Sequence, residues 1–80
     1  MATFPLHILR INETVFSGEA KAINVPGSGG DLTILAKHET LLTSLKEGEI
    51  VVTLADDTEQ SIPIEHGFLE ATSKNVTVLL

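Results

Sequence analysis

The chain has 80 residues, a mass of 8.6 kDa and a formal net charge of −6, with 5 lysines and arginines against 11 aspartates and glutamates. This length suits a single domain, and 42% hydrophobic residues are enough for a packed core. The acidic balance argues against nucleic-acid binding, which draws its affinity from lysine and arginine on phosphates. Because the chain has no cysteine, disulfides, thiolate metal sites and cysteine nucleophiles are excluded.

The N-terminus lacks the basic and apolar regions of a signal peptide, so we do not expect one here. No stretch of the sequence is long and apolar enough to span a bilayer as a helix. We therefore expect no direct membrane insertion, and any association with a membrane would come through a partner.

Short segments rich in valine, isoleucine, leucine and threonine are separated by turn-forming residues, which predicts an all-β sandwich or barrel. The expected strands are, in chain order, Thr3–Ile11, Val15–Val25, Leu32–Leu35, Glu49–Leu54, Glu59–Ile64, Gly67–Thr72 and Val76–Leu79. In the first strand Phe4, Leu6 and Ile8 share one face, and Leu9 and Ile11 add apolar groups to the other. A strand that is apolar on both faces is either sandwiched or covers a partner.

Two residues within the expected strands have positional meaning. Gly18 suggests a β-bulge or a close approach of backbone in the second strand. Pro63 donates no hydrogen bond, so its strand is expected at a sheet edge or with the proline on the unpaired side.

One segment, Lys37–Leu45, does not fit the strand pattern. It places Leu41, Leu42 and Leu45 at positions i, i+1 and i+4, which suits a single helical turn or a packed loop. The segment is too short to form an independent helix.

The glycine-rich stretch Pro26–Asp31 is the first candidate for a binding site. A phosphate-binding loop needs backbone N–H groups that converge on an anion, followed by lysine and serine or threonine. Here Asp31 follows the last glycine, and its carboxylate would repel phosphate. The stretch is therefore predicted to be a turn-forming loop that can adapt to a protein partner.

Catalytic machinery is not evident in the sequence. His7, His38 and His66 lie far apart and show no short metal-ligand spacing, and no nucleophile motif is present. Asp56 and Asp57 are most simply a hairpin tip, with too few oxygen ligands nearby for a calcium loop. We expect no catalytic residue, cofactor or metal, although a deep pocket that joins one of the histidines to two carboxylates would favour an enzyme.

Several motifs together resemble a known family. The motifs lie, in the family's order, within Val15–Ala20, Val25–Leu35, His38–Gly48, Gly67–Ala71 and Asn75–Leu79. They resemble the N-terminal domain of the epsilon subunit of bacterial and chloroplast F-type ATP synthase. The resemblance covers all 80 residues, which we expect to form one domain.

This resemblance implies a flattened β-sandwich of about ten short strands in two sheets. It also implies a non-catalytic rotor subunit that links the gamma subunit to the c-ring and couples ion translocation to ATP synthesis. The residues expected to face the c-ring loops are Gly27, Ser28, Gly29, Gly30, Asp31 and Leu32. The residues expected to pack on gamma are His38, Leu41, Leu42 and Thr43, although Leu41 and Leu42 could equally be core residues.

The expected location is the cytoplasmic face of the bacterial inner membrane, through the ATP synthase complex, with the chloroplast thylakoid as the other possibility. The family usually continues into a helical hairpin, whereas this sequence stops at Leu80, so inhibition or ATP sensing by such a hairpin is not expected of it. His66 stands where the family usually has glycine, which is tolerable unless the backbone there needs a positive φ. The alternative function is that of a free-standing acidic β-sandwich adaptor that binds another protein.

Overall fold

All regular structure in the described residues is β-strand, as the sequence predicts. The computed structural model describes residues 2–36 and 40–80. The strands are β1 (Phe4–Arg10), β2 (Glu13–Gly27), β3 (Gly30–Leu35), β4 (Leu41–Leu45), β5 (Gly48–Leu54), β6 (Glu59–Ile64), β7 (Gly67–Ala71) and β8 (Val76–Leu79). Within these ranges there is no helix long and apolar enough to cross a membrane.

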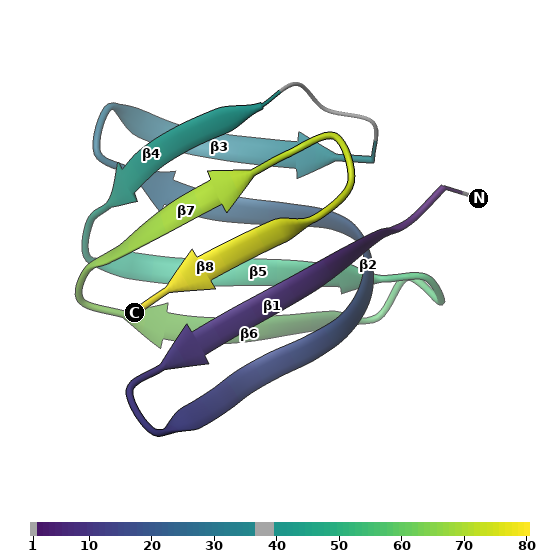
Figure 1. The fold of residues 1–80 in the computed structure, drawn as a ribbon, viewed down its shortest axis with the longest axis horizontal. Coiled ribbons are helices and arrows are strands. Elements are labelled where there is room, and N and C mark those ends of the chain that lie inside the picture. Colours follow the sequence, from purple (N-terminus) through teal and green to yellow (C-terminus); the bar gives the residue numbers. More distant parts are fainter. Residues whose placement is uncertain (1, 37–39) are drawn as a thin grey trace.

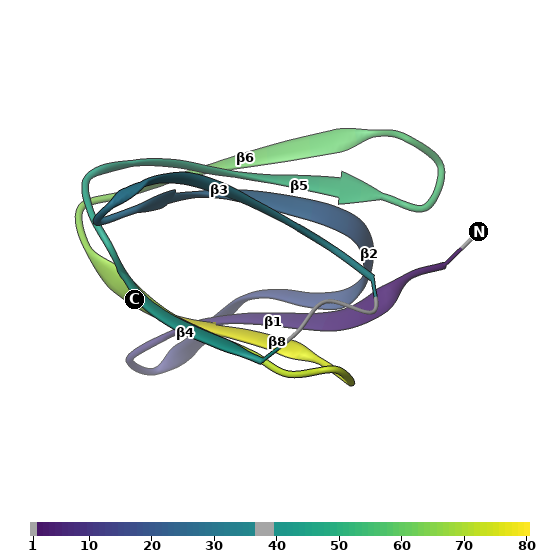
Figure 2. The same ribbon diagram turned by 90° about the horizontal axis from the view of Figure 1, so that it is seen from above.

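The strands stack in two layers, which confirms the expected β-sandwich (Figures 1 and 2). One layer, the β1 layer, contains β4, β7, β8, β1 and the first half of β2. The other, the β5 layer, contains β3, the second half of β2, β5 and β6. The described residues form 8 strands rather than about ten. Hydrogen bonds join them into one continuous sheet, because β2 is long enough to pass from one layer to the other.

Most neighbouring strands are antiparallel, and the one parallel pair in the described residues is β1 with β8. β1 therefore lies between its hairpin partner β2 and the last strand of the chain. At the far side of the β1 layer, β4 pairs with β7 along its whole length but meets β2 only where Leu45 pairs with Gly27.

The core lies between the two layers and is built from the alternating apolar positions. In β1 the inward side chains of Phe4, Leu6 and Ile8 are buried. Ile50 and Val52 of β5, a strand of the other layer, belong to the same core cluster and are fully buried. In the described residues no polar or charged side chain is buried, so burial of apolar surface is the main term that holds the layers together.

The expectation for Pro63 was correct and that for Gly18 was not. β6, which carries Pro63, pairs with β5 alone and is an edge strand, as predicted. The expectation for Gly18 was wrong: this residue pairs regularly with Leu6, and the extra residue of the bulge is Val15, because Ile8 pairs with Phe16 and Leu9 with Thr14. A second register shift lies between Ala20 and Ala22, where β2 passes from pairing with β1 to pairing with β5. Irregularities of this kind bend a strand and increase its twist.

Candidate interaction surfaces

The glycine-rich stretch forms the β2–β3 hairpin. Gly27 pairs with Gly30, and Ser28 and Gly29 form the two-residue tip. Gly30 has a φ of 133°, a conformation that favours glycine. Asp31 follows on β3, where it pairs with Pro26, and its side chain is exposed beside the tip. The six residues expected to face a c-ring therefore form one hairpin with an exposed carboxylate, although Gly27 is buried and Leu32 packs against the core.

The tip and the base of this hairpin are hydrogen-bonded to β4, which belongs to the β1 layer, and to the residue that follows it. The amide N–H of Ser28 donates to the carbonyl oxygen of Ser44 at 2.9 Å, and that of Lys46 donates to the carbonyl of Pro26 at 2.9 Å. The hydroxyl of Ser44 also donates to the hydroxyl oxygen of Ser28 at 3.1 Å. The Ser28 amide is thus already paired within the protein, so it does not contribute to a phosphate-binding nest.

The helical turn expected within Lys37–Leu45 was wrong for its described part, which is strand β4. Leu41 to Leu45 pair along their length with β7. The leucines at i and i+4 fit a strand equally well, because Leu41 and Leu45 share the inward face while Leu42 points outward. The ladder with β7 pairs backbone groups along one whole side of the segment, whereas a single isolated helical turn leaves most of its backbone groups without a partner.

The four residues expected to contact gamma are only partly placed by the structure. Leu41 is 36% exposed and Leu42 58% exposed, so neither is a fully buried core residue. Thr43 is half-buried on the inward face of β4. His38 lies outside the described residues.

The outer face of the β1 layer carries an apolar row that sequence analysis did not assemble. Phe68 of β7 pairs with Leu79 of β8, and Leu79 pairs in turn with Leu9 of β1. Phe68 and Leu79 are 42% and 50% exposed, and Leu9 is half-buried. Leu42 lies on the next strand of the same face, where it pairs with Glu70. We call Leu9, Phe68 and Leu79 the outer apolar row. Contiguous exposed apolar side chains of this kind are typical of protein contacts.

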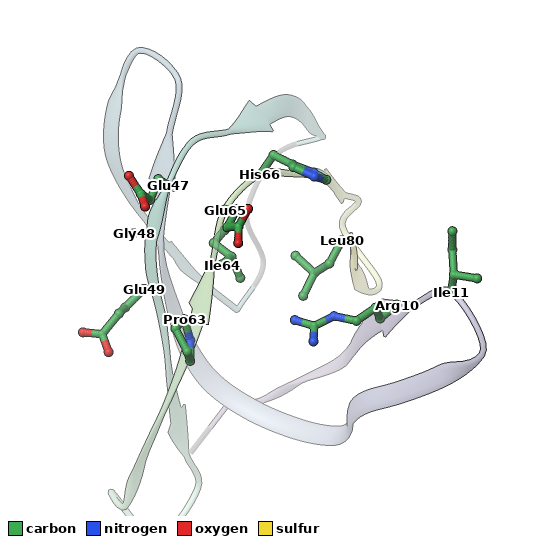
Figure 3. A pocket seen from close by; sticks show the side chains of 10 residues that line it. All are labelled: Arg10, Ile11, Glu47, Gly48, Glu49, Pro63, Ile64, Glu65, His66 and Leu80. Atoms are coloured by element: carbon green, nitrogen blue, oxygen red, sulfur yellow. The ribbon is translucent and has the colours of Figure 1, made fainter.

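A cavity of about 700 Å³ opens at the end of the sandwich that holds the β1–β2 turn (Figure 3). Its wall includes His66, Glu47, Glu49 and Glu65, so it gathers one histidine with several carboxylates. The carboxylate of Glu49, however, points away from the cavity. In the part of the chain that the structure describes, the His66 ring forms no hydrogen bond with the carboxylates of this wall.

His7 and His66 both lie where the fold accommodates them without strain. His7 lies on the outer face of the β1 layer, with Nδ1 3.1 Å from the Ser17 hydroxyl. His66 does not have a positive φ, so the replacement of glycine there is not strained. In the described ranges no three histidine, aspartate or glutamate side chains gather in a way that could hold a metal ion.

The acidic pair forms the β5–β6 turn, as predicted. Asp56 Oδ1 accepts hydrogen bonds from the amide and the hydroxyl of Thr58, at 3.0 and 2.6 Å. The side-chain bond first, and then the backbone bond, lower the pKa of Asp56 below its usual 3.8, because both stabilise the carboxylate. Asp57 takes a φ of 71° and pairs with Lys21. Asp56 therefore stabilises the turn itself, and Asp57 links the turn to β2.

Comparison with known proteins places these features in a family. Residues 3–80 match the family model described as ATP synthase, Delta/Epsilon chain, beta-sandwich domain. The chain is 38% identical over 79 residues to the ATP synthase epsilon chain of Bordetella avium (strain 197N), covering 99% of this chain and 56% of that protein. It is 37% identical over 79 residues to the ATP synthase epsilon chain of Polynucleobacter necessarius subsp. necessarius (strain STIR1), covering 99% and 57%. The chain thus spans little more than half the length of these relatives.

Solved structures with the same fold come from ATP synthases. A chain of the Euglena gracilis mitochondrial ATP synthase, in an OSCP/F1/c-ring structure, matches with a TM-score of 0.92 at 22% identity, over 99% of this chain and 51% of that one. A chain of the Tetrahymena thermophila mitochondrial ATP synthase central stalk/c-ring structure matches with a TM-score of 0.78 at 10% identity, over 95% and 61%. At these identities the likeness establishes the fold. The family-model match over residues 3–80 assigns the chain to the family of ATP synthase delta/epsilon-chain β-sandwich domains.

Proposed function

We propose that this chain is the β-sandwich domain of a central-stalk subunit of an F-type ATP synthase, which links the gamma subunit to the c-ring and so helps couple ion translocation to ATP synthesis. The observation that carries this proposal is the family match over residues 3–80, together with relatives named ATP synthase epsilon chain. In this role the chain contributes no catalytic residue. It acts by holding the gamma subunit and the c-ring in a fixed orientation to each other.

The β2–β3 hairpin is the proposed contact with the c-ring. Its tip residues Ser28 and Gly29 are exposed, and Asp31 stands exposed beside them. A carboxylate at the rim of an interface steers association and sets register when the partner loop carries cations or amides. Because the hairpin tip is fixed to β4, it meets the c-ring as a formed surface and pays little ordering entropy.

The outer face of the β1 layer is the proposed contact with gamma. Leu42 from the expected set lies on this face, and the outer apolar row extends it across β7, β8 and β1. Burial of exposed apolar side chains at the centre of an interface is the main source of affinity. Contact with gamma would also explain why Leu9 is apolar although it points outward, because one reason for a strand to be apolar on both faces is that its outer face contacts a partner.

The proposed location follows from the complex and not from the chain itself. As part of an ATP synthase the chain is associated with a membrane through its neighbours, and we place it on the cytoplasmic face of a bacterial inner membrane. Both relatives named above are bacterial, which supports this placement.

Co-expression with the gamma subunit of the same organism tests the proposal. We expect a stoichiometric complex that survives size-exclusion chromatography, and a weaker complex for Phe68→Glu. The matched control is Ser61→Glu, which adds the same charge to the opposite layer and should leave the complex intact. Absence of binding at tens of micromolar would overturn the gamma contact and leave the adaptor as the better function.

A further inference from the structure

The tip of the β2–β3 hairpin bonds to β4, which adds a tie between the two layers to the one that β2 itself makes. The Ser28 amide donates to the Ser44 carbonyl at 2.9 Å, and the Ser44 hydroxyl donates to the Ser28 hydroxyl at 3.1 Å. Beside them, Gly27 pairs with Leu45, which is the single register pair between β2 and β4. Ser28 and Ser44 therefore link a hairpin of the β5 layer to a strand of the β1 layer.

A hairpin tip without such bonds would move independently of the rest of the fold, because few contacts hold an exposed turn. Here the backbone bond fixes the position of the tip, and the bond between the two hydroxyls restrains its direction. The Lys46 amide, bonded to the Pro26 carbonyl at 2.9 Å, holds the base of the same hairpin. Displacement of the hairpin is consequently passed on to β4.

We propose that the hydrogen bonds between Ser28 and Ser44, which we call the latch, hold the hairpin surface and the outer face of the β1 layer at a fixed angle. The two proposed contact surfaces then move together. The inference rests on the proposed function, because it concerns how the two partner surfaces of that function are connected. Neither serine needs to touch a partner for this role. Both are positioning residues that fix the angle between the two surfaces. A force that displaces the hairpin then also displaces β4 and Leu42, because the hairpin does not bend relative to β4.

The latch itself is tested on the isolated chain by hydrogen exchange. Ser44→Ala removes the hydroxyl donor and leaves the backbone bond in place. We expect exchange of the Ser28 amide to become about fivefold faster, as loss of one hydrogen bond allows. Ser61→Ala, an exposed serine on β6, is the matched control and should leave this rate unchanged. An unaltered Ser28 rate in Ser44→Ala would overturn the latch.

The role in coupling is tested in the assembled ATP synthase. The double variant Ser28→Ala/Ser44→Ala should lower ion-driven ATP synthesis by about twofold or more, because the two contacts are no longer held in register. Both serines lie on the proposed partner surfaces, so the bridged pair described below, which also lacks both hydroxyls, separates loss of the latch from loss of a partner contact. Unchanged synthesis, with faster exchange in the isolated chain, would overturn the coupling role. If the unaltered chain bound neither gamma nor the c-ring, the proposed function would fail and the latch proposal would fall with it.

A disulfide between positions 28 and 44 tests whether a covalent link can replace the lost hydrogen bond and restore ATP synthesis. The chain has no cysteine of its own, so Ser28→Cys/Ser44→Cys introduces its only two thiols, at the two positions whose hydroxyls are hydrogen-bonded in the unaltered chain. Mass spectrometry without reductant establishes that the bridge has formed before synthesis is measured. With the bridge oxidised we expect synthesis at the level of the unaltered chain, and with the bridge reduced a loss like that of the alanine pair. Equal synthesis in the two redox states would contradict the proposal.

Discussion

Gly48 packs directly against Pro26: a Cβ atom at Gly48 would lie 2.9 Å from the Cβ of Pro26, closer than side chains tolerate. The turn between β4 and β5 therefore supports the base of the β2–β3 hairpin. We predict that Gly48→Ala lowers the free energy of unfolding by about 1–3 kcal/mol, because the hairpin base must shift. Urea unfolding measures this change. Gly29→Ala is the control, since a Cβ there would meet nothing within 4 Å. Equal stability of the two variants would show that the hairpin base yields freely.

Val52 is fully buried between the layers, and the described residues place no cation beside it. Val52→Asp should lower the free energy of unfolding by about 3–5 kcal/mol, because it leaves an uncompensated carboxylate in the core. Ser61→Asp makes the same addition at an exposed position of neighbouring β6 and should change stability by no more than about 0.5 kcal/mol. A folded Val52→Asp chain with near-normal thermal unfolding would place Val52 outside the core.

Asp31 is exposed on the proposed c-ring surface, so it should matter for docking and not for folding. We predict that Asp31→Lys changes the free energy of unfolding by less than about 0.5 kcal/mol. The same variant should weaken binding to a detergent-solubilised c-ring, because the charge that steers the contact is reversed. A loss of stability above about 2 kcal/mol would instead make Asp31 a structural residue of the hairpin.

Leu79 and Leu35 allow a matched comparison of the two outer faces, because they are 50% and 58% exposed on opposite layers. Leu79→Ser should weaken binding to gamma about tenfold or more, as truncation of an interface anchor does. Leu35→Ser should leave gamma affinity unchanged. Isothermal titration calorimetry measures both affinities. If the two variants bound equally well, the outer apolar row would not be the gamma surface.

Asp56 makes the stability of the β5–β6 turn dependent on pH. Its two hydrogen bonds from Thr58 lower the pKa in the folded chain below the unfolded value. The stabilisation is therefore fully present above the unfolded pKa and is lost as the pH falls through the folded pKa. Asp56→Asn should unfold with a shallower pH dependence in the acid range. NMR titration of Asp56 provides the direct check, and a pKa at or above 3.8 would contradict the assignment.

Most of the fold could be predicted from the sequence because the inward faces follow a strict period of two. Phe4, Leu6 and Ile8 in β1 are buried as this period requires. β4 was missed because leucines at i and i+4 satisfy both a helical turn and alternate positions of a strand. Only the pairing of Leu41–Leu45 with β7, a long-range contact, decides between them.

The candidate surfaces were predicted less completely, for a related reason. The hairpin follows from local glycine chemistry, and its position along the chain was correctly expected. The outer apolar row depends on the pairing of β1 with β8, which lie at opposite ends of the chain, so no local pattern brings Leu9 together with Phe68 and Leu79. The contact between Ser28 and Ser44 likewise joins residues that no local pattern connects.

The most direct test of the account is whether the chain bridges its two proposed partners. Purified c-ring can be immobilised and exposed to the matching gamma subunit with and without the chain. We predict that capture of gamma rises strongly when the unaltered chain is present, and that Asp31→Lys or Leu79→Ser lowers this capture. Capture of gamma that is equal with and without the chain would contradict the central claim.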